Sequence, residues 1–314
     1  MKTLTIVIPV YNEELVLERF TSGLAEIVLK LQEKNECNVL FVNNGSTDSS
    51  LELLKNCASK FENLGILSMT RNFGYETALI AGLTHAPGEV FALCDADGED
   101  PFELLLEFQS ALTNNYEIAI GIRKNRHEAG VTRGFRLMSY RILSKLSDDP
   151  FKRNAGNFSM FSLAVRNAIL RENLSFPFLR STLSRTGYRA MEFPHDRNPR
   201  IDGKSKYRKI SLMKFAIAGF MTATTWPLRF VSYLAAFNLL VFVMCWFLNV
   251  FFAIAFTNYL DSLALFLLTE IGLSLGVIAL YVARIYKNSL GRPLFYVDWK
   301  NSYQQGNFKF ANHE

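Results

Sequence analysis

Cysteine and histidine are scarce in this chain, with four of each among 314 residues. The cysteines are scattered at Cys37, Cys57, Cys94 and Cys245, and no two of them form a C-x-x-C pair. This spacing is typical of reduced structural or lipid-facing thiols, and it argues against a disulfide framework or a thiol-based metal site.

An excess of charge and a secretory signal are also missing. The net charge is only +5, which gives no case for a nucleic-acid partner. The first apolar run, Leu4–Ile8, is short, and it is followed by Pro9, Glu13 and Glu14. It therefore predicts a buried strand rather than a signal sequence, with the N-terminal half in the compartment where it was made.

From residue 4 to about residue 121, short apolar runs alternate with helical patterns. The expected strands are Leu4–Ile8, Asn38–Val42, Gly65–Ser68, Val90–Cys94 and Glu117–Ile120. The expected helices between them are Glu14–Leu31, Asp48–Lys60, Tyr75–His85 and Pro101–Leu112. This alternation predicts an α/β domain with a mostly parallel, Rossmann-like sheet. Beyond it we expect a helix at Thr132–Leu146 and a loop at Asp148–Asn157.

Two apolar segments near the C-terminus have the length of membrane spans, Phe230–Phe256 and Leu263–Ala283, the second carrying only Glu270. A buried hairpin of a soluble protein is the alternative, although soluble domains rarely carry two such segments. Glu270 is expected to face the partner helix or to lie near the outer interface. The expected organisation is a cytoplasmic catalytic domain (1–209), an interfacial helix (210–228), a two-helix transmembrane hairpin (229–285) and a cytoplasmic tail (286–314).

Lys and Arg flank this hairpin on both sides but are missing from the expected connecting loop, Thr257–Ser262. The positive-inside rule therefore predicts that both termini are cytoplasmic, in a multi-pass protein of the inner (plasma) membrane. The flanking cations are Arg197, Arg200, Lys204, Lys206, Arg208, Lys209 and Lys214 before the hairpin, and Arg284, Lys287 and Arg292 after it.

Asp95 and Asp97 follow the apolar run Val90–Cys94 directly. Carboxylates two residues apart in a turn can share one hard cation, Mg²⁺ or Mn²⁺, with water and phosphate oxygens. Taken alone, the pair fits a solvated acidic turn better. Its place after a buried strand of a parallel sheet favours a site, because ligands bind beyond the carboxyl ends of such strands.

The other strand ends are polar too. In Asn43–Asp48, Ser46 or Thr47 can cap the next helix. Arg71 ends the third strand, and it suits either a phosphate or a structural salt bridge.

Four motifs in this order, Ile8–Glu13 (IPVYNE), Asn43–Asp48 (NNGSTD), Arg71–Gly74 (RNFG) and Asp95–Asp97 (DAD), resemble the family 2 glycosyltransferases with the nucleotide-sugar-binding A-type fold. With the two C-terminal spans, the chain is similar over nearly its whole length to the polyprenyl-phosphate glycosyltransferases. The resemblance implies a nucleotide-sugar donor, a polyprenyl phosphate acceptor, membrane lipids as surroundings and an inverting single displacement. A homo-oligomer is compatible with it.

The resemblance also implies roles for single residues. The nucleotide-sugar residues are Pro9, Tyr11, Glu13, Asn44, Ser46, Asp48, Arg71 and Asp95, and the metal residues are Asp95 and Asp97. Arg123 and Arg126 are placed on the acceptor side of the catalytic centre, and Arg126, Arg200, Ser205 and Lys206 at the lipid phosphate. Attraction to anionic lipid headgroups accounts for some of these basic residues, whatever other role they have.

The chain departs from the family pattern at three places. Asn43 and Asn44 replace a pair of Asp residues, Gly98-Glu99 replaces Leu-Gln, and Asn157 replaces an Asp that is a candidate catalytic residue. The predicted activity is transfer of a hexose, most simply from a UDP-sugar, to a lipid such as undecaprenyl phosphate for cell-envelope glycan modification. The alternatives are a glycan or protein acceptor, or a catalytically degenerate membrane scaffold.

Overall fold

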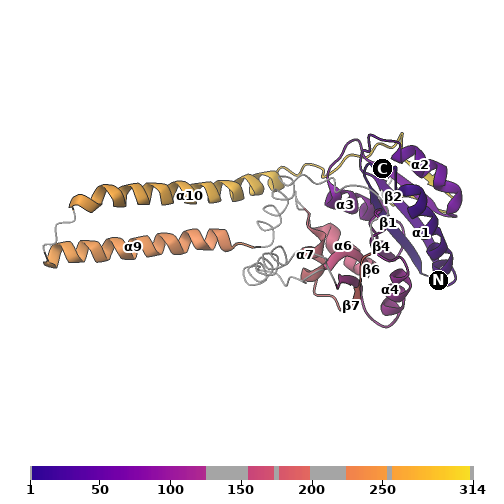
Figure 1. Cartoon of the computed structure of the whole chain (residues 1–314), viewed down its shortest axis with the longest axis horizontal. Helices are drawn as coiled ribbons and strands as arrows, with labels where there is room; N and C mark the ends of the chain where they lie inside the picture. The colour runs from indigo at the N-terminus through magenta and orange to yellow at the C-terminus, as the bar shows by residue number, and fades with distance from the viewer. Residues whose placement is uncertain (1, 125–154, 173–176, 199–223, 253–256, 312–314) are drawn as a thin grey trace.

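The structure is a computed structural model that describes residues 2–124, 155–172, 177–198, 224–252 and 257–311. Its centre is an eight-stranded sheet in the order β7-β5-β6-β4-β1-β2-β3-β8 (Figure 1). The strands are β1 (Thr3–Val10), β2 (Glu36–Asn43), β3 (Leu64–Ser68), β4 (Val90–Leu93), β5 (Ile118–Arg123), β6 (Ala155–Ser162), β7 (Ala190–His195) and β8 (Tyr303–Gln305). Only β6 and β8 run antiparallel to their neighbours, which confirms the mostly parallel α/β sheet.

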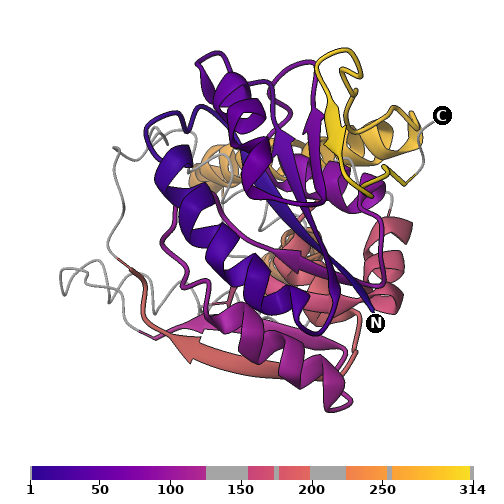
Figure 2. The same ribbon diagram turned by 90° about the vertical axis from the view of Figure 1, so that its right-hand side faces the viewer.

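Helices cover both faces of this sheet (Figure 2). The helices of this domain are α1 (Leu17–Gln32), α2 (Ser50–Asn56), α3 (Tyr75–His85), α4 (Leu104–Thr113), α6 (Leu163–Arg171) and α7 (Leu179–Arg185), with a 3₁₀ turn at Cys57–Lys60. Side chains alternate along the central strands, so that Ile6 and Phe41 pack under α1 while Val7 and Leu40 pack under α3. Because both faces are covered, these strands are apolar throughout.

The expected elements of residues 4–121 are present, with α3 at its predicted bounds and Asp48–Lys60 divided between α2 and the 3₁₀ turn. The predicted loop Asp148–Asn157 is wrong at its end, because Ala155–Asn157 begin β6. Pairing with β4 and β5 on its two sides makes this segment a strand, despite its glycine and asparagine. The predicted helix Thr132–Leu146 lies outside the described residues.

Two long helices, α9 (Trp226–Phe252) and α10 (Thr257–Ser289), lie side by side and project from the sheet domain (Figure 1). Both contain a segment long and apolar enough to cross a membrane, Trp226–Phe247 and Phe266–Ser289. The prediction of a loop at Thr257–Ser262 is wrong, because these residues form the first turns of α10. A helix satisfies its own backbone hydrogen bonds, which favours helix wherever an apolar environment surrounds the chain. Residues 210–223 of the expected interfacial segment, 210–228, lie outside the described residues. The last residues of that segment, from Trp226 on, belong to α9.

Partly buried positions recur every three or four residues along α10, at Glu270, Ser274, Val277 and Tyr281. This is the stripe expected where one helix packs on another. Ser274 Oγ donates to Glu270 Oε1 at 3.2 Å, and the Tyr281 hydroxyl donates to the carbonyl oxygen of Thr224, just before α9, at 2.9 Å. Glu270 therefore lies on the stripe of α10 that packs toward α9.

The segment after α10, which was predicted to be part of a C-terminal tail (286–314), returns to the sheet. Strand β8 pairs with β3, and the Asp298 N–H donates to the Ser68 carbonyl oxygen at 2.7 Å. Phe308 is 2% exposed and lies directly over Gly65, where an added Cβ would come within 2.4 Å of its ring. We call residues 294–311 the C-terminal strap.

Phe308→Ala should lower the free energy of unfolding of the full chain by about 3 kcal/mol, because a buried aromatic ring is lost and a cavity is left. Gly65→Ala should also destabilise the protein, because its methyl group meets the Phe308 ring. In a Phe308→Ala background, Gly65→Ala should become neutral or stabilising, as thermal unfolding in detergent can measure. Additive losses in the double variant would contradict the contact.

Candidate active site

The carboxyl ends of β1 and β2 form one hydrogen-bonded pair of turns. The Asn12 N–H donates to Ser46 Oγ at 3.1 Å, and Asn12 Oδ1 accepts the Thr47 N–H at 2.8 Å. The Glu13 N–H donates to Ser50 Oγ at 2.8 Å. Asn12 has a φ of 55°, a left-handed conformation that asparagine tolerates.

The structure brings most of the predicted nucleotide residues to this edge of the sheet. They are Pro9 and Tyr11 at the end of β1, Glu13 after it, and Asn44, Ser46 and Asp48 in the turn after β2. The prediction that Ser46 or Thr47 caps the next helix is wrong, because α2 begins only at Ser50. Asp48 Oδ1 accepts the Ser50 N–H instead, at 3.0 Å.

Asn43 and Asn44, the first departure from the family pattern, hold this edge together. Asn44 Oδ1 accepts the Phe73 N–H at 2.9 Å, and Asn44 Nδ2 donates to Asn72 at 3.3 Å. The turn after β2 thereby packs on the turn after β3. The approach is so close that a Cβ at Gly45 would lie 2.4 Å from the Arg71 backbone, so only glycine fits there.

Arg71 is exposed at the same edge. Its guanidinium lies over the Phe73 ring, 4.1 Å from the ring centroid, and donates to the Asn72 carbonyl oxygen at 3.3 Å. Within the described residues it makes no ion pair with a carboxylate. The structural salt bridge considered for Arg71 is therefore not found in this part of the chain, and its charge faces outward.

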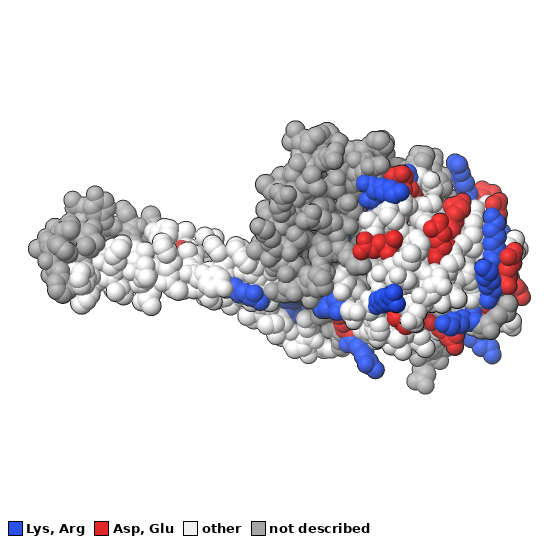
Figure 3. All heavy atoms as spheres, turned by 90° about the horizontal axis from the view of Figure 1, so that it is seen from below, with Lys and Arg blue, Asp and Glu red and all other residues white. Residues whose placement is uncertain are grey.

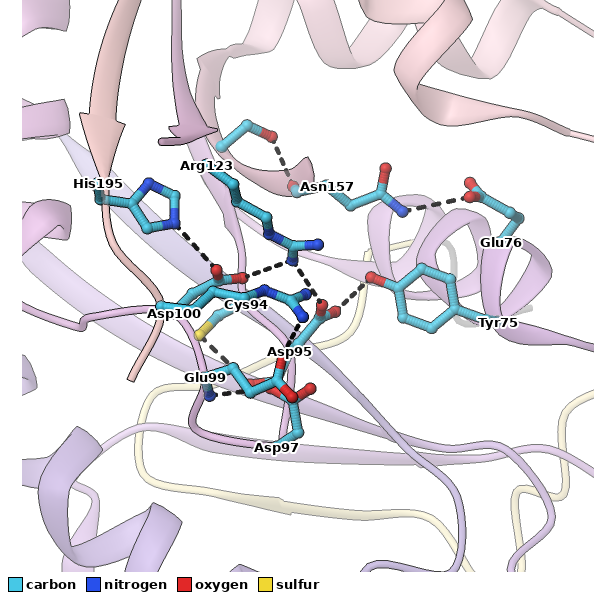
Figure 4. A network of polar contacts seen from close by, with 12 residues as sticks. Tyr75, Glu76, Cys94, Asp95, Asp97, Glu99, Asp100, Arg123, Asn157 and His195 are labelled. Carbon is cyan, nitrogen blue, oxygen red and sulfur yellow. Dashed lines mark hydrogen bonds and ion pairs between the residues drawn. The ribbon is translucent and has the colours of Figure 1, made fainter. Parts of the chain in front are cut away.

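Asp95 and Asp97 lie in the turn after β4 (Figure 4). The Tyr75 hydroxyl donates to Asp95 Oδ1, and Arg123 Nη2 lies 3.9 Å from Asp95 Oδ2. Asp97 Oδ1 accepts the Glu99 N–H at 3.0 Å. Burial and the charge of Asp97 raise the pKa of Asp95 to about 7, and burial also raises the pKa of Asp97. Negative charge is thus concentrated beyond what the surrounding cations neutralise.

A buried ion-pair network lies beside these carboxylates (Figure 4). Asp100 accepts from Arg123 Nη2 at 3.2 Å, and its other oxygen lies 3.1 Å from His195 Nε2. The Asp100 side chain is 1% exposed, that of His195 4% and that of Arg123 10%. Arg123, expected on the acceptor side, is therefore held between Asp100 and Asp95. The pairing of Asp100 with Arg123 and His195 was not predicted, and the position of Asp100 soon after the DAD motif was its only signal in the sequence.

Asn157, on β6, is buried beside the first turn of α3. Its Nδ2 donates to Glu76 Oε1 at 3.2 Å, while the second oxygen of Glu76 accepts the Leu179 N–H at 3.0 Å. Burial raises the pKa of Glu76. The residues expected at the lipid phosphate, Arg126, Arg200, Ser205 and Lys206, lie outside the described residues.

The acidic turn fits a metal ion that is shared with a ligand. No group of three or more His, Cys, Asp or Glu side chains that could hold a metal is found within the described residues. Asp95 and Asp97 nevertheless offer partly exposed carboxylate oxygens, and each has its pKa raised by burial and by neighbouring carboxylates. Two carboxylates suit a hard divalent cation whose remaining ligands are water and phosphate oxygens.

A mostly parallel sheet with polar turns at the carboxyl ends of β1 to β4, and an acidic pair after β4, define an A-type glycosyltransferase. The family model described as "Glycosyl transferase family 2" matches residues 5–174, more than half of the chain. The chain belongs to this family and is a glycosyltransferase.

Relatives match over nearly the whole length. An uncharacterized glycosyltransferase of Synechocystis sp. is 32% identical over 94% of both chains, and YkcC of Bacillus subtilis, also an uncharacterized glycosyltransferase, is 31% identical over 93% of this chain and 92% of its own. The bactoprenol glucosyl transferase of Shigella phage SfV is 28% identical over 96% of this chain and 99% of its own. Similarity thus extends through the two apolar helices.

Asp100→Asn should destabilise the protein by about 3 kcal/mol at pH 7, because Arg123 and His195 lose their buried anion. Burial alone would raise the pKa of Asp100, but the bonds from His195 and Arg123 and the Arg123 charge lower it overall. The stabilisation that the Asp100 carboxylate gives the folded protein is therefore complete above the pKa of an aspartate in the unfolded chain, about 3.9. It is lost as the pH falls through the lower pKa of Asp100 in the folded protein.

Thermal unfolding of both proteins between pH 3 and pH 7 measures this difference, which should shrink below about pH 4. Glu107→Gln, which removes an exposed carboxylate of α4, is the matched control and should unfold like the wild type. An equal loss of stability in the control would show that the network around Asp100 is not the cause.

Proposed function

We propose that this glycosyltransferase moves a hexose from a UDP-sugar to a polyprenyl phosphate, such as undecaprenyl phosphate, at the cytoplasmic face of the inner membrane. The observation that carries the proposal is the acidic turn after β4 in a domain continuous with two helices of membrane-spanning length. The full-length similarity to a bactoprenol glucosyl transferase supports the lipid acceptor. A soluble acceptor would require no such hairpin.

The turns at the carboxyl ends of β1, β2 and β3 bind the nucleotide in this proposal. Tyr11 offers a partly exposed ring, the Asn43–Asp48 turn offers backbone and hydroxyl groups, and Arg71 offers an exposed cation for the diphosphate. Pro9, Glu13 and Asn44 hold the shape of this edge.

Asp95 and Asp97 would hold Mg²⁺ or Mn²⁺ together with the diphosphate of the donor. When bound, the cation neutralises negative charge that grows on the departing diphosphate. The two carboxylates would position the diphosphate only through that cation, and Arg123, whose Nη2 lies 3.9 Å from Asp95 Oδ2, would steady Asp95.

The phosphate group of the acceptor lipid is the nucleophile. Its phosphate monoester has a second pKa near 6 and is mostly a dianion at pH 7, so no base is needed. One phosphate oxygen forms a bond to the anomeric carbon while the bond from that carbon to the donor diphosphate breaks, with inversion. Asn157, which cannot take a proton, then serves only through hydrogen bonds. The cations Arg126, Arg200 and Lys206, with Ser205, are proposed to hold the lipid phosphate.

Membranes that contain the full chain should transfer label from one member of a panel of radiolabelled nucleotide-sugars to an extractable polyprenyl phosphate. Asp97→Asn should reduce this transfer by at least about a hundredfold while the protein stays folded, because a charged oxygen is lost where charge develops. Glu107→Gln serves as the active control. Label appearing in protein or glycan but in no lipid would overturn the proposed acceptor, and full activity of Asp97→Asn in excess chelator would overturn the metal role.

The proposed topology places residues 253–256, which connect α9 and α10, outside and both termini in the cytoplasm. In a variant without its native cysteines, a cysteine placed at Ala255 should be labelled by an impermeant maleimide in intact cells. A cysteine placed at Ser302, in the C-terminal strap, should be labelled only after lysis. External labelling of Ser302 would reverse the assignment and would remove the cytoplasmic donor from the proposal.

A further inference from the structure

Tyr75, the first residue of α3, lies next to the acidic turn although no motif singled it out. Its hydroxyl donates to Asp95 Oδ1 (Figure 4), and its partly buried ring packs against the apolar cluster that includes Ala78 and Phe91. The bond spans twenty residues of sequence and joins the start of a helix to the end of a neighbouring strand. The hydroxyl therefore contacts one of the two carboxylates on which the proposed donor site depends.

Asp95 is held from two sides, whereas Asp97 is not. Tyr75 holds Oδ1, and Arg123 lies 3.9 Å from Oδ2. The Asp97 carboxylate is contacted by the backbone N–H of Glu99 at 3.0 Å. Arg123 is itself drawn toward Asp100, at the shorter distance of 3.2 Å, so the Tyr75 hydroxyl is the closest donor to Asp95 among the described side chains.

Tyr75 is in turn fixed by its neighbours in the chain. Gly74, with φ of 95°, allows the sharp entry into α3, and its N–H donates to Asn72 Oδ1 at 2.8 Å. On the other side, the 5% exposed Glu76 bonds to Asn157 on β6 and to the Leu179 N–H on α7. The residues next to Tyr75 are thus hydrogen-bonded to the turn after β3, to β6 and to α7. The phenol therefore has little freedom to move away from Asp95.

We propose that Tyr75 is a positioning residue of the donor site, which holds the Asp95 carboxylate in the orientation that receives the metal–diphosphate part of the nucleotide-sugar. Hydrogen bonds to a ligating carboxylate orient it and are a general requirement of metal sites. The inference rests on the proposed function, since it assumes a nucleoside diphosphate and a divalent cation at this turn. It adds a residue and a role that neither the motif nor the helix pattern indicated.

The test is Tyr75→Phe, which keeps the ring and removes only the hydroxyl. Binding of UDP and of GDP to the purified full chain is measured by calorimetry with and without Mn²⁺. The variant should bind nucleotide in Mn²⁺ about tenfold more weakly than the wild type, the size expected for losing one hydrogen bond to a charged group. Its binding without Mn²⁺ and its KM for the polyprenyl phosphate should be unchanged.

Tyr303→Phe is the matched control, because it also removes one tyrosine hydroxyl bond, to Gln305 on β8, far along the sheet. Unchanged Mn²⁺-dependent binding in Tyr75→Phe, an equal loss in Tyr303→Phe, or a loss confined to the acceptor KM would each overturn the role of Tyr75. A wild type that binds nucleotide with Mn²⁺ but labels no lipid would overturn the proposed acceptor. Weaker Mn²⁺-dependent binding in Tyr75→Phe would then still support the role of Tyr75. A wild type without any Mn²⁺-dependent nucleotide binding would overturn both.

Discussion

The contact between Arg123 and Asp100 is the interaction on which the rest of the site depends. Asp95, Asp97, Glu99 and Asp100 follow β4 within seven residues, and burying several like charges together is strongly unfavourable unless they are paired. Arg123 pairs with Asp100 in the interior, and His195 Nε2 lies within hydrogen-bond distance of its other oxygen. Asp95 and Asp97 have fewer cationic partners at the rim, where the proposed divalent cation would complete the charge balance.

This division of charge depends on how the sheet continues past β4. Strand β6 enters between β4 and β5 in the antiparallel direction, and it brings Asn157 beside α3. Strand β5 then carries Arg123 and β7 carries His195 toward the same turn. The half of the sheet formed by β1 to β4 thus presents the edge proposed to bind the nucleotide, while the added strands supply the groups that pair with the acidic turn.

Much of the fold could be predicted because its signals are local. Continuous apolar strands alternate with amphipathic helices, and Gly74 and Ala86 bound α3 where the pattern predicts it. β6, β7 and β8 were not predicted, because each is a strand only through partners distant in sequence. The Thr257–Ser262 segment was assigned to a loop on its polarity, although it contains neither proline nor glycine.

For the site, the motif order predicted the acidic pair and the nucleotide turns, and the structure places these residues after the carboxyl ends of β1 to β4, while their roles stay predictions. The compensating partners could not be found in this way. Tyr75 and Glu76 read as ordinary first-turn helix residues, and His195 is a lone histidine in a weakly patterned segment. Their importance arises from contacts that span up to 103 residues of sequence, as between Leu179 and Glu76. The placement of Arg126 and the other basic residues before α9 stays a prediction.

The C-terminal strap has a consequence for how the protein is made. Domains generally fold from the N-terminus during synthesis, yet β3 cannot gain its outer partner until Tyr303–Gln305 leave the ribosome. By then both long helices have already been translated. The nascent sheet therefore presents an open edge throughout that interval, a state prone to mispairing with other chains. Closure of that edge by β8 makes completion of the sheet a late step of synthesis, after both apolar helices have been translated.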